Sequence, residues 1–201
     1  FDDGSVQVFP SNEADPRYQL FVGSAVPLYC ESFNDNPAWP QGSNMGLEWQ
    51  WGPPVIGLAG EDPPAAYTGT NVFGTDLSAD GRYRPNLVTS TTAPAVTNPS
   101  FELVHLQYWR WLTVEDGTFD QATIPANGRP IWKNPKPVNG TLDHVDREWR
   151  FHDVDISDKV VDGRVVARFE IPPDSDIELG GWNLDDVCVV SFRAPAAGDD
   201  A

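Results

Sequence analysis

Residues 180–190 read Gly-Gly-Trp-Asn-Leu-Asp-Asp-Val-Cys-Val-Val, and this stretch decides the fold class of the chain. The two glycines allow a tight turn, and large apolar side chains then alternate with polar ones, as in a β-strand. Strict alternation would place Asp186 and Cys188 on the face that carries Trp182 and Leu184. One aspartate would then lie among large apolar residues, where a bare carboxylate needs a hydrogen-bond donor or a cation.

The only other cysteine, Cys30, lies far upstream, beside Glu31 and close to Phe33. The simplest arrangement places this segment alongside the strand at 180–190, so that the first and last strands of one domain meet. Two cysteines fit one disulfide in a secreted protein, and we predict a bond between Cys30 and Cys188. Two unpaired buried thiols are the alternative.

Glycine and proline punctuate the chain densely, with 17 Gly and 19 Pro in 201 residues. This composition favours many short strands over long helices. Eight Trp and ten Phe allow a sizeable core. The β-prone stretches form about eight or nine strands separated by turns. We therefore predict an all-β fold, an antiparallel β-sandwich or jelly roll.

Three stretches define the predicted sheets most clearly. The apolar and aromatic run from Leu103 to Leu112 is predicted to be a central strand. Asn127-Gly128 predicts the tight turn of a β-hairpin. The segment from Val165 to Ile171 alternates and is predicted to be one strand, with Val165, Ala167, Phe169 and Ile171 facing inward.

The chain divides into three parts by composition. Residues 1–29 are interpreted as an N-terminal extension, a linker or an added hairpin. Residues 30–193 form the predicted jelly-roll module. The small and acidic residues 194–201 are expected to be a flexible tail.

The net charge of −17 limits the partners of the chain. Nucleic acid and anionic membrane surfaces would be repelled. No apolar run reaches the ~18 residues of a membrane span. With one disulfide, we expect a secreted or cell-surface protein, present here as a mature or excised fragment.

Six short motifs occur in a characteristic order. They are ESF at 31–33, EWQWG at 48–52, GTNVFGTDL at 69–77, WRWLTVED at 109–116, Trp149 with DIS at 155–157, and GWNLDDV at 181–187. Together they resemble the MAM-like jelly-roll modules of secreted bacterial proteins. These include cleaved-adhesin modules, the C-terminal modules of immune-inhibitor-A-type proteases, and modules of large surface proteins of myxobacteria and related bacteria.

The resemblance implies a galactose-binding-like jelly roll over roughly residues 31 to 190. It implies a role in adhesion, in glycan or protein binding, or in supporting a neighbouring catalytic domain. A structural calcium ion is frequent in such modules.

The residues also predict a calcium site. Glu31 and Asp186 stand near the two ends of the module, and a jelly roll brings its first and last strands together. The segment from Asn71 to Asp76 can add amide, carboxylate and carbonyl oxygens, which are the ligands that Ca²⁺ prefers. We predict Glu31, Asn71, Asp76 and Asp186 as ligands. The alternative is that Glu31 and Asp186 are only hydrogen-bonded.

Catalytic groupings are weak in this sequence. His105, His144 and His152 do not stand at metal-ligand spacing, and no Gly-x-Ser-x-Gly motif occurs. Loop acids could form a glycosidase pair, but such acids are more often solvated or calcium-bound. We therefore expect no enzyme, with an acid-based glycan-active enzyme as the weaker alternative. The acids concerned are Glu115, Asp116, Asp120, Glu170, Asp174, Asp176 and Glu178.

Trp109 and Trp111 share one face of the predicted central strand. If that face is exposed it forms a binding surface, and otherwise both rings belong to the core. We predict that these two residues, with Glu115, Asp116 and Asp120, bind the ligand. The predicted function is a non-catalytic adhesion or binding module for a glycan or a protein. Self-association, or packing against a neighbouring domain in an extracellular array or filament, is the alternative.

Overall fold

The structure is a computed structural model and describes residues 24–40, 48–56, 61–77, 80–97 and 103–193. These residues form antiparallel sheets and a single 3-10 turn at Ser157–Lys159. The predicted all-β sandwich is therefore confirmed. No helix among the described residues is long and apolar enough to cross a membrane.

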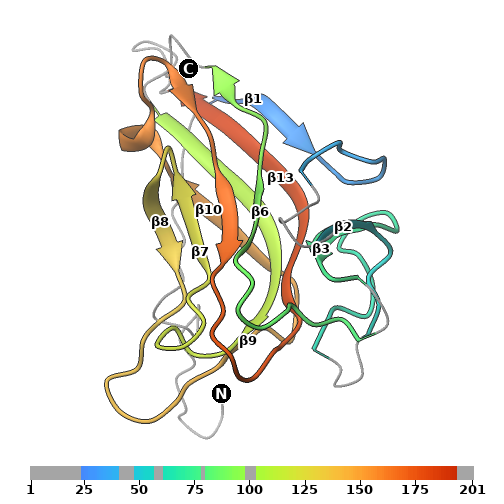
Figure 1. The fold of residues 1–201 in the computed structure, drawn as a ribbon. Helices are drawn as coiled ribbons and strands as arrows, with labels where there is room; N and C mark the ends of the chain where they lie inside the picture. Colours follow the sequence, from blue (N-terminus) through green and yellow to red (C-terminus); the bar gives the residue numbers. More distant parts are fainter. Residues whose placement is uncertain (1–23, 41–47, 57–60, 78–79, 98–102, 194–201) are drawn as a thin grey trace, which may run out of the picture.

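The larger sheet contains the two longest strands, which lie side by side at its centre (Figure 1). Its order is β10 (Arg150–Asp155), β6 (Leu103–Val114), β13 (Gly181–Arg193), β3 (Val72–Thr75) and β2 (Trp49–Gly52). Two more strands join it, because β1 (Ser24–Glu31) pairs with β13 and β9 (His144–Val145) pairs with β6. The predicted central position of the Leu103 strand is confirmed.

The smaller sheet covers the inner face of the larger one (Figure 1). Its order is β4 (Thr89–Thr92), β12 (Arg168–Ile171), β7 (Thr123–Ala126) and β8 (Arg129–Lys133). The predicted hairpin at Asn127-Gly128 joins β7 to β8. Both turn residues have positive φ, 46° and 74°, as a type I′ turn requires.

One predicted strand is divided in the structure. The segment from Val165 to Ile171 forms β11 (Arg164–Val165), which pairs with β5 (Val96–Thr97), and then β12, which belongs to the smaller sheet. Its inward positions are confirmed nevertheless, because the alternation of side chains continues across the break. Val165, Ala167, Phe169 and Ile171 are all buried in the core.

The core lies between the two sheets and is rich in large side chains. Trp182 packs edge-on against both Phe169 and Trp132. Tyr108 of β6 also meets Phe169 edge-on. Each fully buried ring of this kind stabilises the fold by about 2 to 3 kcal/mol relative to an exposed position.

A β-bulge in β13 overturns the predicted alternation of residues 180–190. The register shifts between Asp185 and Cys188, and Asp186 adopts a φ of 45°. The extra residue moves the following side chains to the other face, so Val187 and Val189 join the core in place of Cys188. Asp186 is therefore only partly buried, and the buried Asp185 lies on the face away from Trp182 and Leu184, where it accepts the N–H of Thr68. The prediction that Asp186 and Cys188 share the face of Trp182 and Leu184 was wrong.

The predicted disulfide is present. Cys30 and Cys188 are direct partners in the β1–β13 ladder and their sulfur atoms are bonded. β1 starts at Ser24, within the range assigned to the N-terminal extension. Residues 1–23 and the predicted tail 194–201 lie outside the described residues.

A buried ion pair stands inside the sandwich at Arg110, which the sequence did not identify. Its guanidinium is fully buried, donates to the carboxylate of Asp146 at 2.8 and 3.2 Å, and lies over the ring of Trp132. His144 contacts the same carboxylate. Burial alone would raise the pKa of Asp146, but the charges and hydrogen bonds of Arg110 and His144 together outweigh it and lower the pKa well below its usual range.

Candidate functional site

An irregular segment, residues 61–70, is fastened to the outer face of β6 and β13. The indole of Trp111 donates to the carbonyl of Glu61 at 2.9 Å. The Asn183 side chain donates to the Asp62 carboxylate at 2.7 Å, and the N–H of Thr68 donates to Asp185 at 2.9 Å. These bonds leave Trp111 only 8% exposed. It therefore supports this segment rather than presenting its ring to solvent.

The neighbouring residue on the same face, Trp109, has a different environment. Tyr67 stacks on its ring with centroids 3.5 Å apart, and Phe151 of β10 meets it at 5.4 Å. Tyr67 is 43% exposed and Phe151 is 44% exposed, while Trp109 is half-buried. These three rings form an exposed row, which we call the aromatic platform.

The aromatic platform stands on paired strands of the larger sheet and has polar neighbours. Phe151 and Trp109 are cross-strand partners, and Asp185 faces Trp109 on the other side. Burial, with the nearby charge of Asp186, raises the pKa of Asp185 to about 6, although the Thr68 N–H opposes the shift. Trp149 donates its indole N–H to Ala65 and so anchors the same segment.

The predicted acids at the end of β6 gather in a separate place. Glu115 follows β6, Asp120 precedes β7, and Asp174 lies in the loop between β12 and β13. One carboxylate oxygen of each lies within 4.8 Å of the others. We call these three residues the acidic cluster. Asp116 is not part of it, and its carboxylate accepts the N–H groups of Thr118 and Leu142.

Neighbouring groups hold the acidic cluster in position. The Asp120 carboxylate accepts the hydroxyl of Tyr83 at 2.5 Å and the N–H of Asp174 at 2.7 Å. The side chain of Asn134 donates to the carbonyls of both Glu115 and Asp120. Burial, followed by the charges of Asp120 and Asp174, raises the pKa of Glu115 to about 7.

The four predicted calcium ligands fall into two groups. Glu31 ends β1, and its partner across the ladder is Val187, next to Asp186. The hydroxyl of Thr68 donates to Asp186, and Asn71 donates to the carbonyl of Asn34.

Glu31, Asn71 and Asp186 therefore belong to segments that contact one another. Asp76 lies beyond the other end of β3, where its N–H donates to the backbone carbonyl of Glu48. Burial raises the pKa of nearby Asp62 to about 7, and the charges of Glu61 and Asp76 add to this shift.

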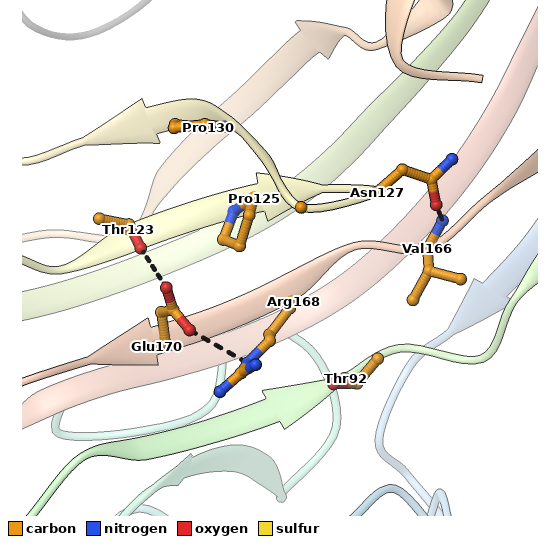
Figure 2. Close-up of a pocket in the computed structure, with 9 residues that line it drawn as sticks. Thr92, Thr123, Pro125, Asn127, Pro130, Val166, Arg168 and Glu170 are labelled. Atoms are coloured by element: carbon orange, nitrogen blue, oxygen red, sulfur yellow. Dashed lines mark hydrogen bonds and ion pairs between the residues drawn. The ribbon is translucent and has the colours of Figure 1, made fainter. Parts of the chain in front are cut away.

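A groove of about 470 Å³ lies on the smaller sheet (Figure 2). Glu170 lies at one end of the groove, paired with Arg168 at 3.0 Å and accepting the hydroxyl of Thr123 at 2.9 Å (Figure 2). Asn127 closes one end by accepting the N–H of Val166. The lining contains no aromatic ring; it consists of Thr92, Thr123, Pro125, Asn127, Gly128, Pro130, Val166, Arg168 and Glu170.

Comparison with known proteins identifies the fold. The chain resembles the K1 cleaved adhesin domain of Lys-gingipain from Porphyromonas gingivalis W83, at 17% identity and a TM-score of 0.50. This match covers 86% of the present chain and 100% of that domain. The K3 cleaved adhesin domain of the same protein matches at 12% identity and a TM-score of 0.45, over 84% and 99% of the two chains.

No protein-family profile matches the sequence. No curated protein matches it either. The similarity to the K1 domain supports the cleaved-adhesin part of the resemblance at the level of fold. The resemblance to MAM modules stays a prediction.

Proposed function

We propose that this protein is a non-catalytic binding module that presents the aromatic platform to a carbohydrate. The observation that carries the proposal is the exposed row of Tyr67, Trp109 and Phe151 on a rigid sheet. Exposed aromatic patches of this kind mark binding surfaces on soluble proteins. Flat rings match the apolar faces of pyranose sugars, and the polar groups beside them can accept hydroxyl hydrogens.

The resemblance to the K1 domain supports a binding role, since that domain is described as a cleaved adhesin domain. The disulfide fits an oxidising compartment, and we place the module in a secreted or cell-surface protein. A protein ligand would use the same exposed rings, which makes it the second candidate.

The groove on the smaller sheet is the weaker candidate for this ligand. The only carboxylate among the described residues of its lining, that of Glu170, already pairs with Arg168 and accepts the hydroxyl of Thr123. A sugar entering there would have to displace these contacts and would find no ring to stack on. At the aromatic platform a sugar can stack on the rings without displacing contacts of this kind.

A glycan array, with binding detected on wild type and four variants, tests the proposal. We expect Tyr67→Ala and Phe151→Ala each to weaken binding about fivefold, because one ring contact is worth roughly 1 kcal/mol. Phe119→Ala removes a ring of matching exposure, 43%, elsewhere on the surface and should leave binding unchanged.

Arg168→Ala separates the platform from the groove. If this variant loses binding while Tyr67→Ala keeps it, the ligand belongs in the groove. If wild type binds no glycan and light scattering shows a concentration-dependent oligomer, the module serves in self-assembly instead.

We further propose that Glu31, Asn71 and Asp186 hold a structural calcium ion. Contacts between the segments that carry these three residues support this. Asp76, the fourth ligand expected from the sequence, follows the opposite end of β3 and is not part of this proposal. Asp186→Asn should lower the melting temperature in calcium but much less in chelator. Equal effects in both conditions would leave Glu31 and Asp186 as hydrogen-bonded carboxylates only.

A further inference from the structure

The acidic cluster has a feature that its own hydrogen bonds do not explain. Glu115 is only 5% exposed, and its Oε2 atom is buried without a hydrogen-bond partner. An unsatisfied buried carboxylate oxygen costs free energy, and two further carboxylates beside it add to that cost. The site therefore holds acceptor capacity that no described group of the protein uses.

The described residues offer the three acids of the cluster no ion-pair partner. None of the ion pairs formed by the described residues includes Glu115, Asp120 or Asp174. Asp143 and Asp116 add further negative charge at Glu115. A buried group of like charges is stable when the groups are protonated or when a cation lies between them.

We propose that the acidic cluster is a binding site for a divalent cation, and that this cation is Ca²⁺. Three carboxylates with oxygens within 4.8 Å of one another can all reach one ion. The donor set is oxygen only, without the histidine nitrogen or cysteine sulfur that zinc favours. Ca²⁺ accepts several carboxylates in flexible geometry, whereas Mg²⁺ retains much of its water and demands a regular octahedron.

The surrounding hydrogen bonds suit an ion site. Tyr83 and the N–H of Asp174 both donate to Asp120, which fixes a charged carboxylate in place. Asn134 ties the two ends of the turn from Glu115 to Asp120 together. Such outer contacts orient ligands before the ion arrives. Asp174 is only partly buried and leaves the cluster open toward solvent.

This site is separate from the one predicted at Glu31 and Asp186. Its ligands come from the loop after β6 and the loop after β12, whereas Glu31 and Asp186 lie on the β1–β13 ladder. An ion at the acidic cluster would connect the two sheets, because β6 belongs to the larger sheet and β12 to the smaller one.

Calcium titration by calorimetry tests the proposal on the intact protein, after treatment with chelator and exchange into chelator-free buffer. Glu115→Gln and Asp174→Asn each remove one charge with little change in shape. Each should weaken one calcium-binding event by about tenfold or more, because ligand charge sets the affinity of such sites. Asp176→Asn, in the same loop but outside the cluster, should bind as wild type does. Asp186→Asn should leave calcium binding at the acidic cluster intact, even where it removes calcium binding at the site proposed at Glu31 and Asp186.

The melting temperature supplies a second test, because Glu115→Gln is expected to act in opposite directions in chelator and in calcium. In chelator, Glu115→Gln should melt at or above the wild-type temperature, because it removes repulsion among the carboxylates. In saturating calcium it should melt below wild type, because wild type alone gains the full stabilisation by the ion. Magnesium should reproduce little of that gain.

Three results would overturn the proposal. The first is that wild type binds no calcium, and the second is that calcium binding survives both Glu115→Gln and Asp174→Asn. The third is that Glu115→Gln destabilises the protein equally in chelator and in calcium. The last result would show that the cluster is held together by shared protons and hydrogen bonds alone.

Discussion

At the scale of single residues, buried polar side chains set the response of the sandwich to pH. His152 lies against Tyr108 with ring centroids 5.0 Å apart, and neither ring nitrogen has a hydrogen-bond partner among the described residues. Burial, followed by the positive charge of Arg110, lowers the pKa of His152 to about 2. His144 and Arg150 act in the same direction, and Asp146 opposes them. This imidazole therefore stays neutral in the folded protein.

The pH dependence of stability follows from this shift. The folded pKa lies below the unfolded value near 6.5, so the unfolded chain binds the extra proton first. His152 therefore contributes stability that is complete above about pH 6.5 and is lost as the pH falls toward 2.

His152→Phe keeps a ring beside Tyr108 and removes the titration. The unfolding free energy of wild type minus that of the variant should fall by roughly 1 kcal/mol for each pH unit below 6.5. Urea midpoints at pH 7.5, 6.5 and 5.5 measure it. Parallel curves for the two proteins would show that the folded imidazole already carries a proton.

At the scale of elements, β13 determines how the larger sheet is assembled. It pairs with β6 along most of its length and with β1 and β3 on its other edge. The disulfide joins the β1 and β13 partners across 158 residues of sequence. Cross-linking so long a loop restricts the unfolded chain far more than the folded one.

Replacing both cysteines by serine should therefore lower the unfolding free energy by about 4 to 5 kcal/mol in the chain-entropy model. Chemical denaturation of the variant and of wild type, both without reductant, measures the difference. A loss below about 1 kcal/mol would mean that the unfolded chain is already compact near these residues.

The limits of sequence interpretation also appear at this scale. Local patterns were sufficient for the hairpin at Asn127-Gly128 and for the inward positions from Val165 to Ile171. The bulge at Asp186 was missed because alternation says nothing of an inserted residue, although two adjacent acids in an apolar strand signalled a conflict. The sequence pointed to the three acids of the acidic cluster one by one but did not group them, because Asp174 comes close to Glu115 only when distant loops pack together.

At the scale of the whole molecule, three surfaces have distinct positions. The aromatic platform lies on the outer face of the larger sheet, the groove lies on the smaller sheet, and the acidic cluster lies in loops that connect the two. Sequence analysis identified Trp109 from its parity with Trp111. It could not separate the two, because residues 61–70 contact both rings and bury Trp111 almost completely, while Trp109 stays half-buried under Tyr67.

The most direct test of the binding account is nuclear magnetic resonance of the tryptophan indole N–H groups, with the glycan selected on the array as titrant. The account predicts that the Trp109 indole signal shifts and saturates with the sugar, while the signals of buried Trp132 and Trp182 stay in place. Tyr67→Ala should abolish the shift at the same sugar concentration. A bound glycan that leaves Trp109 unmoved would contradict the account.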